Sequence, residues 1–350
     1  HHPTPEWIDK ISEMNLFDKG WHELRKTIFA NQKKLGVLPK DAKLTPWPDD
    51  LIKHWDELSV VERKLFIKQA DVFAAYVAYT DHEIGRVVQA VDDLGKLDNT
   101  LIIYITGDNG TSSEGGPTGT PNEVASVQGV HLPAEAMMKY YDVWGSDQTY
   151  PHMSVGWTWA FGTPFSWTKM VSSHFGGTKQ GTVISWPKVI KDKGGVRNQF
   201  HHVVDIAPTI LEATGIPLPE EIDGIEQTPM DGVSMLYTFD KKNADAPSTH
   251  KTQYFEMIGD RAIYHDGWIL STKVMRVPWD NSGTADKDPA SWPWELYDLS
   301  KDWTQFNDVA AQYPEKVKEL EKLFWAEADR NQVLPMDTTT FTRSLLPRPN

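Results

Sequence analysis

The residues best suited to chemistry follow one apolar segment. Residues 100–106 are β-branched, aliphatic and aromatic, and Gly107-Asp108-Asn109-Gly110 comes directly after them. A carboxylate beside an amide oxygen suits a hard cation such as Ca²⁺ or Mg²⁺, whereas Zn²⁺ prefers nitrogen and sulfur ligands. The same tetrapeptide is also typical of an ordinary turn. The sequence therefore leaves open a cation site or a simple turn at Asp108 and Asn109.

A long loop follows, residues 111–173, and it is rich in glycine, proline and aromatic residues. Long loops in compact domains are usually functional. Lys169, near the end of this loop, could bind an anion with a point charge and three donors, although a single lysine is most often on the surface. His174 follows shortly after Lys169 and could face the same site. A structural or surface position for His174 is equally compatible with the sequence.

These residues need elements that bring them together. Residues 101–105 predict a central parallel strand that is buried on both faces. Ligands in open α/β sheets bind beyond the carboxyl ends of the strands. Residues 181–186 predict a second core strand. We therefore expect Asp108 and Asn109 to lie at the end of a strand and close to Lys169.

Helices are predicted by their caps and apolar spacing. One begins at Pro5, and a second runs from about Gly20 to a stop at Gly36. Ser59 and Glu62 form a capping box for a long helical stretch. That stretch ends at Gly95, and its length predicts a break near residues 80–81.

A further helix begins after Asp205, which has the position of an N-cap, with Pro208 in its first turn. His201 and His202 precede it. A histidine pair can bind metal, but no carboxylate–histidine pattern surrounds this one, so the sequence favours structural roles.

The C-terminal part has the pattern of a separate small sheet. Residues 253–257, 261–265, 268–272 and 295–298 predict antiparallel strands, with a hairpin turn at Asp266-Gly267. Pro314 opens an amphipathic helix. The chain thus predicts an α/β unit followed by a smaller antiparallel sheet plus helix.

Composition limits the function classes. The 350 residues carry a net charge of −14 without a basic cluster, which argues against nucleic acid as a partner. No run approaches the ~20 apolar residues of a membrane span. The sequence has no cysteine, so cysteine nucleophiles and thiolate metal sites are excluded. It predicts neither the compartment nor the oligomeric state.

Several segments together resemble the sulfatases, the arylsulfatase branch of the alkaline-phosphatase-like superfamily. They follow the family order and span nearly the whole chain. The matching segments are residues 107–116 with Asn122-Glu123, residues 154–160 with residues 163–165 and Lys169, residues 174–178 with residues 185–187, and residues 200–215.

The resemblance implies a fold and a site. The fold is α/β, an alkaline-phosphatase-like mixed sheet flanked by helices and present in part. Asp108 and Asn109 would bind a divalent cation, usually Ca²⁺ with Mg²⁺ as the alternative, and Lys169 would bind the sulfate and act in catalysis. His1 is the nearest match to the histidine that protonates the leaving group, but it could equally be a frayed terminal residue. His174 is a candidate for substrate binding.

The resemblance is incomplete. Sulfatases carry a formylglycine nucleophile made from Cys-x-Pro-x-Arg or Ser-x-Pro-x-Arg, and neither pattern occurs in this sequence. The paired metal-binding aspartates of the family's first strand are also missing. We therefore expect the C-terminal portion of an arylsulfatase, with residues 1–245 in the catalytic domain, 246–333 in a small α+β subdomain and 334–350 as a tail.

The implied reaction is hydrolysis of a small-molecule sulfate ester to an alcohol or phenol and sulfate. This chain alone would be catalytically incomplete. Two alternatives stay open: a phosphonate or phosphate ester hydrolase of the same superfamily, and a noncatalytic binding protein on a degenerate hydrolase fold.

Overall fold

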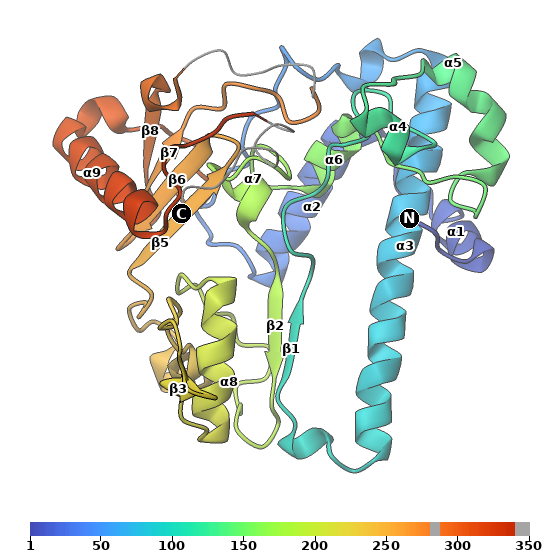
Figure 1. Ribbon diagram of the computed structural model, residues 1–350. Helices are drawn as coiled ribbons and strands as arrows, with labels where there is room; N and C mark the ends of the chain where they lie inside the picture. Colours follow the sequence, from blue (N-terminus) through green and yellow to red (C-terminus); the bar gives the residue numbers. More distant parts are fainter. Residues whose placement is uncertain (281–287, 340–350) are drawn as a thin grey trace.

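The computed structural model describes residues 1–280 and 288–339 (Figure 1). Helices near the N-terminus form one part, and an antiparallel sheet covered by the C-terminal helix forms another. A two-stranded ribbon and a long helix extend from the helical part in the same direction in this view. This arrangement of helices and sheets confirms the α/β fold class. The predicted tail falls mostly on residues 340–350, outside the described residues.

The helical part has a core of aromatic side chains. Trp21, Phe66 and Trp157 are almost fully buried, and the ring of Trp21 contacts the other two. The indole of Trp157 donates a hydrogen bond to the Phe66 carbonyl at 2.7 Å. Five helices contribute to this core, which explains part of the high tryptophan content. They are α1 (Pro5–Ser12), α2 (Gly20–Leu35), α3 (Val60–Asp93), α5 (Ala134–Met137) and α6 (Val155–Phe161).

Helix α3 has 34 residues and begins at the predicted capping box, in which Ser59 and Glu62 bond each other's backbone N–H groups. It continues without interruption through residues 80–81, so the break predicted there is wrong. The Thr80 hydroxyl donates to the Tyr76 carbonyl one turn earlier, and this bond lets Thr80 remain inside the helix. The buried residues of α3 all precede Tyr76, so its second half is helical without burying a full face.

Strand β1 (Ile102–Ile105) follows α3 and pairs with β2 (Thr182–Ser185). Both strands lie where the sequence predicts them. Their pairing is antiparallel, however, with Ile103 opposite Ile184, and the residues of β1 are only half-buried. The predicted parallel, doubly buried strand is therefore wrong, because an apolar β-branched run signals a strand but carries no information on the direction of its partner.

The C-terminal sheet has the order β5-β6-β7-β8 with antiparallel neighbours, as predicted. Its strands are β5 (Thr252–Met257), β6 (Asp260–His265), β7 (Trp268–Thr272) and β8 (Trp294–Asp298), and helix α9 (Pro314–Arg330) packs on it.

Alternate residues of this sheet face two different layers. Ile263, Leu270 and Leu296 pack against α9, whereas their neighbours Ile269 and Tyr297 pack against the segment that contains Phe165 and Phe175. Side chains in a strand alternate between faces, so neither face of this sheet is left to solvent at these positions. The second layer is the segment that flanks Lys169 on both sides.

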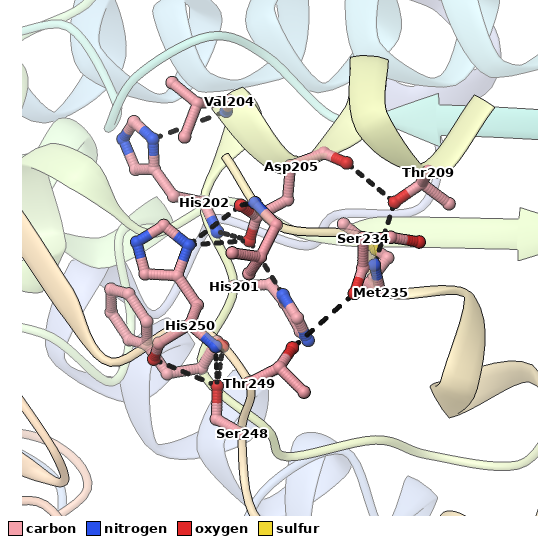
Figure 2. Close-up of polar contacts among 12 residues, drawn as sticks. His201, His202, Val204, Asp205, Thr209, Ser234, Met235, Ser248, Thr249 and His250 are labelled. Carbon is pink, nitrogen blue, oxygen red and sulfur yellow. Dashed lines mark hydrogen bonds and ion pairs between the residues drawn. The ribbon is translucent and has the colours of Figure 1, made fainter. Parts of the chain in front are cut away.

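A buried carboxylate connects α8 to the C-terminal sheet. Asp205 closes a short helical turn (Val203–Asp205) ahead of α8 (Ile206–Thr214), and its side chain is fully buried. Figure 2 shows His201 and His250 turned toward it from either side, with their Nδ1 atoms 2.7 and 2.8 Å from its oxygens. The backbone N–H groups of His202 and Val233 also donate to it. His250 immediately precedes β5, so Asp205 links α8 to the C-terminal sheet.

The remaining short elements are α4 (Glu123–Val127), α7 (Phe175–Thr178), β3 (Glu221–Ile222) and β4 (Ile225–Glu226). None of the helices within residues 1–280 and 288–339 is long and apolar enough to cross a membrane.

Candidate active site

The loop after β1 lies against the segment that contains Lys169. The Gly110 N–H donates to the Gly177 carbonyl at 2.8 Å, and the Lys169 N–H donates to the Thr111 carbonyl at 3.1 Å. A Cβ on Gly110 would lie 1.7 Å from the Gly176 carbonyl oxygen, so only glycine permits this approach. Two segments that are far apart in the sequence are thereby joined through their backbones.

Asp108 and Asn109 stand at the start of this loop. Asp108 is exposed and Asn109 is half-buried. A free carboxylate and an amide oxygen at one place fit a hard cation, but they supply only two of the six to eight oxygens that Ca²⁺ takes. Among the described residues, no group of three or more His, Cys, Asp or Glu side chains could hold a metal. Cation binding by Asp108 and Asn109 stays a prediction.

Lys169 is held by an acidic residue that the sequence analysis gave no role. Its Nζ donates to both carboxylate oxygens of Glu114, at 2.9 and 3.0 Å, and the Ser112 hydroxyl donates to the same carboxylate at 2.8 Å. Burial acts to raise the pKa of Glu114, but the bonds from Lys169 and Ser112 hold it below its usual value. The Lys169 side chain keeps about a third of its surface exposed, at 33%.

A second carboxyl and a histidine complete the surroundings of this ion pair. Glu123 opens α4, and burial together with the neighbouring Glu114 carboxylate raises its pKa. The Ser126 hydroxyl, also on α4, donates to the Glu114 carbonyl at 2.8 Å and fixes the two segments together. His152 is buried beside them, and burial lowers its pKa.

His1 lies at the edge of the same cluster. Its ring packs edge-on against Phe73 and Tyr76 at 5.2 Å and lies 5.6 Å from the ring of His152. Its Nδ1 is 3.2 Å from the Pro151 carbonyl oxygen. The first residue is therefore packed rather than frayed.

His174 has a different environment. It is 5% exposed, and its Nε2 lies 3.3 Å from a carboxylate oxygen of Glu295 on β8. Its Nδ1 is 2.9 Å from the Ser173 hydroxyl. Burial acts to raise the pKa of Glu295, but the bond from His174 lowers it overall. Both ring nitrogens are thus engaged inside the protein, which favours the structural interpretation over substrate binding.

An open cavity of about 420 Å³ adjoins the cluster. Tyr140 and Tyr150 line it together with His2 and Asn122, among others. The Glu123 N–H donates to the Tyr150 carbonyl at 2.8 Å and ties the cavity wall to the carboxyl pair. Aromatic faces with a few polar groups are typical of small-molecule sites.

The sequence analysis missed Glu114, Glu123 and His152. Glu114 and Glu123 lie in the glycine-rich loop already identified as functional, so acidic residues in that loop were a usable signal. His152 lies in the same long loop, but the sequence did not single it out, because its proximity to Lys169 depends on how the loop folds.

Comparisons with known proteins identify the family of this chain. The sulfatase family model matches residues 14–216. The chain is 28% identical over 319 residues to an uncharacterized sulfatase of Schizosaccharomyces pombe, covering 90% of this chain and 53% of that protein. It is 26% identical over 260 residues to an arylsulfatase of Klebsiella aerogenes, covering 73% of this chain and 50% of that protein.

Among solved structures, the one described as Ps i-CgsB covers 97% of this chain and 58% of its own, with 16% identity and a TM-score of 0.48. The chain spans about half the length of the curated relatives named above. Because the family model covers more than half of the 350 residues, this protein belongs to the sulfatase family.

Proposed function

We propose that this protein contributes to the hydrolysis of an organic sulfate ester, as an arylsulfatase-type hydrolase. The observation that carries the proposal is the position of Lys169. Its backbone is bonded to the loop that bears Asp108 and Asn109, and a carboxylate holds its ammonium group. A cationic group whose backbone is bonded to the loop with the candidate cation ligands, in a sulfatase-family chain, suits a sulfuryl group whose charge must be neutralised during transfer.

Each residue has a separate role in this proposal. Lys169 binds the sulfuryl oxygens. Asp108 and Asn109 hold a divalent cation, usually Ca²⁺, which when bound would neutralise charge on the same oxygens. The Nδ1 of His1 faces the Pro151 carbonyl, so its Nε2 is the atom that would pass a proton to the leaving alcohol or phenol. The cavity beside Glu123 supports an aryl or sugar group as the organic part.

We also propose that this 350-residue chain does not turn over by itself. Its sequence contains neither formylglycine motif and no cysteine. Serines near the site do not replace them: the Ser112 hydroxyl donates to Glu114, and the Ser113 hydroxyl accepts a bond from Thr168. The Glu114 carboxylate is a poor base for Ser112, because the bonds from Lys169 and Ser112 hold its pKa below its usual value, and a hydroxyl without an effective base is a weak nucleophile.

The missing nucleophile also favours a second candidate, a noncatalytic protein that binds sulfate esters. A phosphate or phosphonate ester hydrolase is the alternative within the same superfamily. Both alternatives use Lys169 to bind an anion, as the sulfatase proposal does. The binding protein differs in having no turnover, and the phosphate or phosphonate ester hydrolase differs in the anion that it prefers.

The test combines turnover and binding. Nitrophenyl sulfate and nitrophenyl phosphate are incubated with the purified chain, with and without Ca²⁺, and we expect no hydrolysis above the buffer blank. Binding of inorganic sulfate and phosphate is measured by calorimetry. Lys169→Met should abolish sulfate binding, whereas Lys139→Met, which changes an exposed lysine, should not.

A longer protein that includes a formylglycine motif should hydrolyse nitrophenyl sulfate. In that protein, Lys169→Ala should lower kcat by roughly 10²-fold or more, because the developing charge loses one preorganised partner. Unchanged sulfate binding in Lys169→Met would refute the assigned site. Turnover by the 350-residue chain that disappears on changing Ser112 would refute its proposed incompleteness.

A further inference from the structure

The ammonium group of Lys169 is already neutralised inside the protein. Glu114 accepts from it with both carboxylate oxygens, and the Glu114 side chain is 17% exposed. An anion that binds Lys169 must therefore compete with Glu114 or accept a position beside it. At the effective dielectric constant of a protein surface two opposite charges in direct contact still attract each other, so this competition weakens anion binding.

A second acid increases the conflict. Glu123 opens α4, which the Ser126 hydroxyl ties to the Glu114 carbonyl at 2.8 Å, and the Glu123 carboxyl interacts with that of Glu114. Two ionised carboxyls together with a bound sulfate would place four negative charges around one lysine. Two carboxyls that share a site do not both stay ionised when further negative charge arrives. One proton on the pair would relieve this repulsion, and burial with the neighbouring Glu114 carboxylate already raises the pKa of Glu123.

We propose that Glu114 is an internal counter-ion of Lys169 that gives way when an anion binds, and that the Glu114–Glu123 pair takes up one proton in that step. This inference rests on the proposed function, because it assumes that Lys169 is the anion site. Glu114 acts through Lys169 and is a positioning residue. It holds the ammonium in the binding geometry while the site is empty.

The charged and titratable groups around the pair come from five segments. The loop after β1 supplies Glu114, and α4 supplies Glu123. The segment before α6 supplies His152, and the later loop supplies Lys169. The terminal ammonium of His1 also interacts with Glu123. His152 is the other group in this cluster that could take up a proton when a sulfate binds, so the test must separate it from Glu123.

Proton uptake makes anion binding depend on pH. When one proton is taken up per anion, the apparent affinity falls roughly tenfold for each pH unit above the pKa of the free pair. Inorganic sulfate is a suitable probe because it stays a dianion at every pH at which the carboxyl pair could lose its proton. Calorimetry in two buffers with different ionisation enthalpies counts the protons directly. Circular dichroism and thermal melting establish that each variant is folded.

Four isosteric or near-isosteric variants test the assignment. Glu123→Gln should bind sulfate without proton uptake and lose the pH dependence. Glu114→Gln should bind sulfate at least roughly tenfold more tightly than the unmodified chain near pH 8, because one competing charge is removed. His152→Gln and Glu135→Gln should keep the proton uptake. Glu135 is the matched control, an exposed acid on α5.

The outcomes separate the two proposals. Three results would each overturn this inference while leaving Lys169 as the anion site. The first is a sulfate affinity of the unmodified chain that does not depend on pH, and the second is unchanged or weaker sulfate binding in Glu114→Gln. The third is proton uptake that disappears in His152→Gln and persists in Glu123→Gln. Unchanged binding in Lys169→Met would overturn the proposed site itself. Absence of sulfate binding in all of these proteins would overturn both.

Discussion

The buried Asp205 is the residue whose change should affect stability most clearly. Its carboxylate accepts bonds from His201 and His250 and from two backbone N–H groups (Figure 2). Although burial acts to raise the pKa of Asp205, these bonds hold it well below its usual range. His250 donates through both nitrogens, to Asp205 and to the Thr252 carbonyl, so it is an imidazolium ion.

Asp205→Asn would leave this imidazolium without its counter-charge. The amide would also turn an NH₂ group toward groups that donate. Breaking a buried ion pair on one side costs about 3–5 kcal/mol. With an unfolding entropy of about 2.1 cal/mol/K per residue, that loss lowers Tm by about 4–7 °C for a chain of this size.

Thermal unfolding followed by circular dichroism near pH 6 provides the measurement. Asp266→Asn is the matched control, because Asp266 forms an exposed ion pair with Lys251 at a turn position with φ of 46°, which asparagine also adopts readily. We expect no measurable change in Tm for the control. A Tm for Asp205→Asn that is equal to that of the unmodified chain would show that the buried ion pair does not stabilise the fold.

Three further predictions follow from local contacts. The Asp205 bond raises the pKa of His250 against the effect of burial, so this stabilisation is complete below the usual histidine pKa of about 6.5 and is lost as the pH rises through the raised pKa. Tm should therefore fall as the pH rises above about 6.5, and less so in His250→Gln. Gly85→Ala changes an exposed position of α3 with no atom near the new Cβ and should raise the free energy of unfolding by about 0.5–1 kcal/mol. Gly110→Ala would place its Cβ against the Gly176 carbonyl and should lower the free energy of unfolding by about 1–3 kcal/mol; urea titration measures both variants. Phe324→Ala, in the layer between α9 and the sheet, should lower the free energy of unfolding by about 3–5 kcal/mol, measured by the same urea titration. A loss below about 1 kcal/mol would contradict the assigned packing.

The sequence predicted elements whose signals are local. The capping box at Ser59, the glycine that ends α2 and the alternating strands of the C-terminal sheet all depend on residues close together in the chain. Each is a backbone requirement that one or two neighbouring residues satisfy. These elements were found close to their predicted bounds.

Features that depend on distant partners were predicted less well. Asp205 has the position of an N-cap, but its carboxylate makes no such bond to α8 and instead binds His250. Glu114 and Lys169 meet only because the long loop folds back on itself. The apolar run of β1 could not reveal an antiparallel partner. In each case the local residue types are compatible with several partners, and the tertiary structure selects one.

The uneven burial of α3 divides one helix into two regions of different local stability. Its buried side chains end at Ala75, while the helix continues to Asp93. Amide hydrogens in the first region should exchange with solvent only when the whole domain unfolds, whereas those in the second region can exchange through opening of single turns. A helix about 51 Å long, continuous in its hydrogen bonds, therefore does not move as one cooperative unit. We expect its last turns, beyond the contacts of Tyr79 and His82 with Trp7, to open locally while the tryptophan core stays folded.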